Sequence, residues 1–95
     1  MFPSLRTTLT SAADTSGGKA LRQLVWSLWT NHLATGIWQG IPAVNLFDAI
    51  TALDDSARQE FATLLTLPLD ARTDTIRQIL HESGEWDRID TIPAF

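Results

Sequence analysis

Residues 17–33 have the sequence GGKALRQLVWSLWTNHL, and this stretch decides the fold. Its apolar side chains recur at every third or fourth position, which places them on one face of an α-helix. They are Ala20, Leu21, Leu24, Val25, Leu28 and Trp29. The polar side chains that fall mostly on the other face are Arg22, Gln23, Ser27, Thr30 and Asn31. We therefore predict an amphipathic helix, capped by Thr15 or Ser16, as the centre of a small helical core.

The composition predicts one small domain. A chain of 95 residues, 44% of them hydrophobic, suits a single core and leaves no room for a second domain. We expect a single helical domain over residues 1–95, with flexible ends at about 1–3 and 91–95. The absence of cysteine excludes a disulfide framework and fits a reducing cytoplasm. No apolar run is long enough for a signal peptide or a membrane span, so we predict a cytoplasmic location.

Turn signals divide the chain into short helices, expected over about 3–13, 17–33, 45–53, 55–67 and 73–83. The apolar stripe of the third consists of Leu46, Phe47, Ile50 and Leu53. Asp54 or Asp55 can cap the fourth helix, and Pro68 prevents it from continuing. Gly84 is a left-handed terminator for the fifth, and Trp86 suggests a final turn packed on the core. The predicted fold class is an all-α, compact, single-domain bundle of five to six short helices.

Four tryptophans carry the hypothesis of an interaction surface. Trp38 lies in the glycine-flanked segment ATGIWQGIP (residues 34–42), together with the apolar residues Ile37 and Ile41. Trp26 and Trp86 could each cover the edge of the core or anchor a partner, because large aromatic side chains dominate both settings. The predicted contact residues are therefore Ile37, Trp38, Ile41, Trp26 and Trp86, whereas Trp29 is assigned to the core.

Catalytic and ligand-binding motifs are missing from the sequence. His32 and His81 have no metal-ligating partner at i+3 or i+4 on their own predicted helices, and no HExxH pattern occurs. A GxSxG nucleophile motif is also absent. Gly17, Gly18 and Lys19 lack the remainder of a phosphate-binding GxxxxGK[ST] loop. We therefore predict no enzymatic activity, no cofactor and no metal.

The charge balance disfavours nucleic acid as a partner. Eleven acidic residues against seven Lys and Arg give a net charge of −4. The helix pair from Asn45 to Leu67 could be mistaken for a helix-turn-helix, although its second helix offers only Arg58 and Gln59 as base readers. The C-terminal arginines alternate with acids and predict a mixed, solvated surface; these charged residues are Asp70, Arg72, Asp74, Arg77, Glu82, Glu85, Asp87 and Arg88.

Three stretches together resemble a family of small uncharacterised helical proteins carried on proteobacterial plasmids, integrative elements and phages. They are DTSGGKALRQLVWSLWTN, NLFDAITALDDSARQEFATLLTL and IRQILHESGEW. The corresponding residues are Asp14, Trp29, Asn31, Leu53 with Asp54, and Gly84 to Trp86. The chain departs from the family pattern in a longer loop over residues 34–44, in Thr30 between Trp29 and Asn31, and in a later His81. The resemblance implies a helical fold and a mobile-element setting, and it brings no known activity.

The leading hypothesis is a non-enzymatic module that binds another protein. A mobile-element or phage protein that inhibits host machinery, such as a defence system, is its more specific form. One alternative is a homodimer with a structural role, in which the same apolar surface closes a symmetric interface. A second alternative is a DNA-binding regulator that uses the helix pair from Asn45 to Leu67.

Overall fold

The structure, a computed structural model, describes residues 2–33 and 46–91. Within these ranges the chain forms five α-helices and one 3-10 helix, and it contains no β-strand. They are α1 (Pro3–Ser11), α2 (Ser16–Leu33), α3 (Leu46–Ala52), α4 (Asp55–Leu65), α5 (Leu69–Glu82) and η1 (Glu85–Thr91). The predicted all-α fold class is confirmed.

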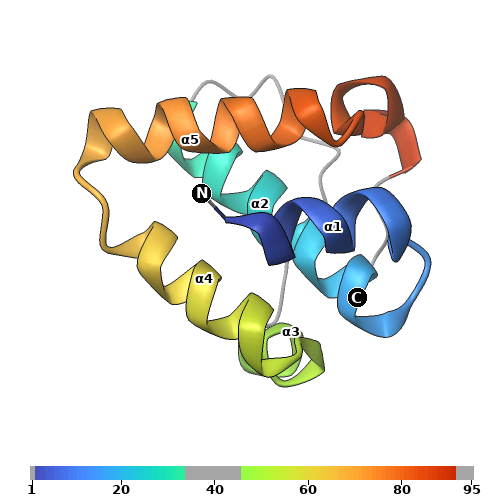
Figure 1. The fold of residues 1–95 in the computed structure, drawn as a ribbon. Helices are drawn as coiled ribbons and strands as arrows, with labels where there is room; N and C mark the ends of the chain where they lie inside the picture. Colours follow the sequence, from blue (N-terminus) through green and yellow to red (C-terminus); the bar gives the residue numbers. More distant parts are fainter. Residues whose placement is uncertain (1, 34–45, 92–95) are drawn as a thin grey trace.

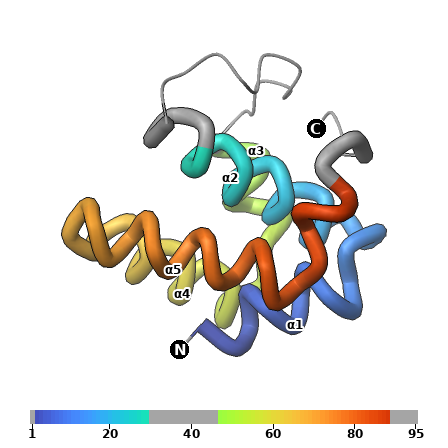
Figure 2. The backbone as a smooth tube through the Cα atoms, turned by 90° about the horizontal axis from the view of Figure 1, so that it is seen from above, coloured from blue at the N-terminus to red at the C-terminus, as the bar shows by residue number. Residues whose placement is uncertain are grey.

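Helix α2 forms the centre of the bundle (Figures 1 and 2). It contacts α1, α3 and α5. Helix α4 packs on α1 and α5. Because neighbours surround α2, every residue from 20 to 26 is buried. The prediction that Arg22 and Gln23 lie on an exposed polar face is therefore wrong: their exposed fractions are 5% and 0%. An apolar stripe shows which face must be buried, but it does not show that the opposite face is left in water.

Local signals place most helix ends correctly. The Thr15 hydroxyl accepts a hydrogen bond from the Gly18 amide at 3.0 Å, and the Asp54 carboxylate accepts one from the Ala57 amide at 2.8 Å. Both are N-caps of the predicted kind. Helix α5 begins at Leu69, four residues before the expected start. Pro68 directly precedes it, and a fixed proline φ suits the entry to a helix as well as it suits the end of the previous one.

Two glycines are required by the backbone. Gly84 has a φ of 76° and ends α5 in the left-handed conformation, as predicted. Gly18 lies where α2 passes close to the end of α1, so that a Cβ atom there would be 1.9 Å from the Ala12 carbonyl oxygen. Helices α1 and α2 are therefore so close at this point that only a glycine fits at position 18.

Candidate functional site

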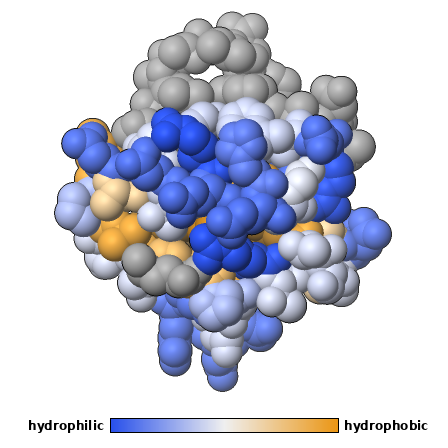
Figure 3. All heavy atoms as spheres, turned by 45° about the horizontal axis from the view of Figure 1, so that its top comes forward, coloured by the Kyte–Doolittle hydropathy of each residue, from blue (hydrophilic) through white to orange (hydrophobic). Residues whose placement is uncertain are grey.

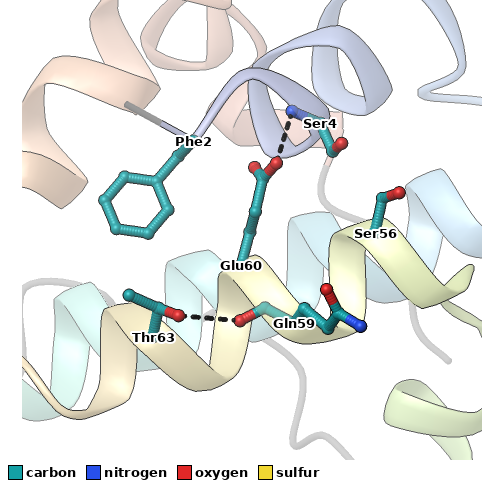
Figure 4. Close-up of a pocket in the computed structure, with 6 residues that line it drawn as sticks. All are labelled: Phe2, Ser4, Ser56, Gln59, Glu60 and Thr63. Atoms are coloured by element: carbon teal, nitrogen blue, oxygen red, sulfur yellow. Dashed lines mark hydrogen bonds between the residues drawn. The ribbon is translucent and has the colours of Figure 1, made fainter.

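Phe2 and Glu60 join the start of α1 to α4 (Figure 4). The Phe2 side chain, near the start of the chain, is buried in the core. The Glu60 carboxylate accepts hydrogen bonds from the Ser4 and Leu5 amides, both at 3.0 Å. These amides belong to the first turn of α1, which has no cap from its own preceding residue. Glu60 therefore caps α1 from a distant position in the sequence.

A pocket of about 360 Å³ lies beside this contact, lined by Phe2, Ser4, Ser56, Gln59, Glu60 and Thr63. Its one ionisable side chain, Glu60, is committed to the α1 amides. The Thr63 hydroxyl donates to the Gln59 backbone carbonyl at 3.0 Å. No base lies against a hydroxyl among these lining residues, so the pocket lacks the arrangement that nucleophilic catalysis needs.

A second polar feature is the Glu85 cluster, which consists of Glu85, Arg22, Arg88 and Trp26. Glu85 has an exposed fraction of 0%. Its carboxylate accepts from Arg22 Nε at 2.7 Å and from Trp26 Nε1 at 3.1 Å, and it forms an ion pair with Arg88. Arg88 also donates to the Leu9 carbonyl at 3.0 Å. The cluster thus ties η1 to both α1 and α2.

The prediction that Glu85 belongs to a solvated mixed surface is wrong. Gly84 reverses the chain after α5, and the residue that follows it meets α2 rather than water. A buried carboxylate requires charged or hydrogen-bonding partners, and Arg22 supplies them from 63 positions away in the sequence. The available signal was an arginine inside the amphipathic helix that the sequence predicts as the centre of the core.

Three of the four tryptophans pack together beside this cluster. The Trp86 ring meets the Trp26 and Trp29 rings edge to face, with centroids 5.2 and 5.4 Å apart. Trp26 has an exposed fraction of 0%, so the structure places it in the core and not on a surface that a partner could contact. Trp29 is also in the core, as predicted, and Trp86 is partly buried against it. The predicted contact residues Ile37, Trp38 and Ile41 lie outside the described residues.

An apolar surface feature lies elsewhere, between α3 and α4. This α3–α4 groove has a volume of about 330 Å³ and is lined by Ile50, Arg58, Gln59, Phe61, Ala62 and Leu65. Helix α3 packs mainly on α2, whereas α4 packs mainly on α1. The two helices follow each other in sequence, but their side chains do not fill the space between them. The face shown in Figure 3 is mostly hydrophilic, with a hydrophobic patch at the left of the view and smaller ones between the hydrophilic side chains across its middle.

Phe47 on α3 is 86% exposed, which contradicts its predicted place in the apolar stripe. Ala49 on α3 and Leu53 just after it are buried in the core. Phe47 lies about 200° around the helix from Ala49. Ile50, one turn after Phe47, is partly buried and lines the groove. Phe47 therefore stands on the groove side of α3, away from the core.

The described side chains offer no metal centre, because they contain no group of three or more His, Asp or Glu residues that could hold an ion. His81 is exposed at the end of α5, where its ring lies 5.4 Å from that of Trp86.

None of the helices in the described ranges combines the length and apolar character needed to cross a bilayer. The part of the chain that the structure describes is thus an all-α domain with a structural ion cluster and an apolar surface groove. No family model, curated protein or solved structure matches the chain.

Proposed function

We propose that this protein is a protein-binding module and that the α3–α4 groove with Phe47 is its contact surface. The observation that carries the proposal is the exposure of Phe47 one helical turn from Ile50, which lines an apolar groove. A single exposed apolar side chain is ordinary on a protein surface. A large aromatic side chain next to an apolar depression is different, because binding could bury both at once, and aromatic residues seated in pockets supply most of the energy of many interfaces.

The charges at this surface disfavour the DNA-binding alternative. In a helix-turn-helix, the N-terminal residues of the second helix approach the bases. Here that position, at the start of α4, carries Asp54 and Asp55. Arg58 is already engaged, because it donates to the Leu53 carbonyl at 2.9 Å and pairs with Asp55 at 3.2 Å. Carboxylates at the leading end of the helix would repel the phosphate backbone.

The more specific hypothesis, that the partner is host machinery and that binding inhibits it, stays a prediction. The same is true of a contribution from Ile37, Trp38 and Ile41. A homodimer that uses the groove is the second candidate function, because an exposed aromatic side chain beside a depression could pair with a second copy of itself.

The test is a quantitative pull-down from a proteobacterial lysate with wild type, Ala62→Glu and Gln78→Glu. Ala62 is exposed on α4 and lines the groove, and Gln78 is exposed on α5. Both substitutions add the same charge at an exposed helical position, so helicity should be preserved. We expect a stoichiometric protein that Ala62→Glu loses and Gln78→Glu retains. A retained partner in both variants would move the contact surface away from the groove, and recovery of this chain alone would favour the homodimer.

A further inference from the structure

The shape of the α3–α4 groove indicates what kind of segment fits it, if the proposed function holds. Its walls are two helices, and backbone groups inside a helix pair with one another rather than with a ligand. The described part of the chain has no β-strand and therefore no sheet edge to which an extended peptide could add. A segment that enters an apolar groove without backbone partners must satisfy its own backbone hydrogen bonds, and an α-helix does so.

The charge around the groove indicates the composition of that helix. Asp54 and Asp55 lie where α3 meets α4, at the start of the helix whose Arg58, Ala62 and Leu65 line the groove. Both are exposed. The one cation lining the groove, Arg58, is paired with Asp55, so the exposed charges of α3 and α4 have an acidic excess. Because the whole chain also has a net charge of −4, a positively charged partner is favoured both at long range and at contact.

The same acidic excess argues against a second copy of this chain as the occupant. A two-fold interface places identical surfaces opposite each other. Asp54 and Asp55 of one copy would then approach those of the other, and juxtaposed like charges disfavour association. A different, basic partner has no such cost.

We propose that the α3–α4 groove binds a basic amphipathic helix of a partner protein. Its apolar residues, spaced i, i+3 or i+4, and i+7, fill the groove lined by Ile50, Phe61 and Leu65 and cover Phe47. Its Lys and Arg residues lie on the flank formed by the start of α4, opposite Asp54 and Asp55. This inference rests on the proposed function, since it names the chemistry of the partner at the same surface.

Selection from a displayed library of random 18-residue peptides tests the inference, with Ala62→Glu protein used for counter-selection. Peptides that bind wild type and not Ala62→Glu are the groove binders, and their sequences are compared. We expect apolar residues at helical spacing with flanking Lys and Arg, and loss of binding when proline replaces a central residue. The variant Asp55→Lys should weaken these peptides by about tenfold or more, equivalent to about 1.4 kcal/mol. The matched variant Asp74→Lys on α5, which also removes an aspartate paired with an arginine three residues later, should not.

Each other outcome overturns a distinct statement. Groove binders that are acidic, or that tolerate the central proline, would contradict the basic helix while supporting a protein-binding groove. Binders that Ala62→Glu does not affect, or no binders at all, would contradict the proposed function itself. A wild-type dimer in sedimentation equilibrium that Ala62→Glu converts to a monomer would assign the groove to a second copy of the chain.

Discussion

The Glu85 cluster and the α3–α4 groove use similar residues in opposite ways. Each combines arginine and aromatic side chains that come from more than one helix. In the Glu85 cluster, Trp26 and Glu85 are fully buried, and the carboxylate is surrounded by donors. At the groove, Phe47 is exposed and Arg58 turns back to its own helix and the preceding turn. The difference teaches that an aromatic side chain is a core residue only when another element covers it.

The largest effect should come from the centre of the Glu85 cluster. Glu85→Gln keeps the shape of the side chain but leaves the buried Arg22 without its countercharge. Removing one partner of a buried ion pair costs about 3–5 kcal/mol, and we expect a loss of that size in the free energy of unfolding, measured by urea denaturation. The control is Asp74→Asn, because Asp74 forms an exposed pair with Arg77 and should contribute less than about 1 kcal/mol. Equal losses of unfolding free energy in the two variants would contradict the contrast between a buried and an exposed ion pair.

A smaller effect should separate close packing from open surface. Gly18→Ala places a methyl group against the Ala12 carbonyl, and the backbone has to shift. Overpacking of this kind costs about 1–3 kcal/mol, part of which the better helix propensity of alanine offsets. Ala62→Leu adds more atoms at the α3–α4 groove, where space is open. Thermal unfolding should show a lower Tm for Gly18→Ala and little change for Ala62→Leu; a reversed order would show that the groove is closed in solution.

Loss of the Glu60 cap on α1 should lower the free energy of unfolding by less than the two changes above. Glu60→Ala removes the acceptor for the Ser4 and Leu5 amides. Loss of a capping side chain costs about 1 kcal/mol. Hydrogen exchange should report the change at the first turn of α1 more than in α2. Gln59→Ala, at the neighbouring exposed position, serves as control, and a similar acceleration of exchange there would argue against the capping role.

The smallest effect on stability belongs to Phe47. Phe47→Ser removes an aromatic ring that is 86% exposed, so the free energy of unfolding should change by less than about 0.5 kcal/mol. The same variant should lose the partner that Ala62→Glu loses. Chemical denaturation measures the first quantity and the pull-down measures the second. A large loss of stability would instead assign Phe47 to the core, as its spacing in the sequence predicted.

Features that depend on neighbours in the chain were predictable from the sequence. The helix count, the Thr15 and Asp54 caps and the left-handed Gly84 all follow from residues within four positions of one another. The candidate site was not predictable in the same way. Phe47 has the spacing of a core residue, and only the rotation of α3 against α2 turned it outward. Glu85 sits in a run of alternating charges typical of a solvated surface, yet it is buried.

The sequence by itself determined an all-α chain with the apolar face of residues 17–33 inside, because helix formation and capping are short-range effects. The tertiary structure alone decided that α2 is covered on both faces, that Arg22 and Glu85 form an ion pair, and that the space between α3 and α4 stays open. Those outcomes depend on contacts between residues far apart in sequence, such as Glu60 with the start of α1 and Glu85 with α2. Burial is a property of the assembled neighbours, and no local pattern contains it.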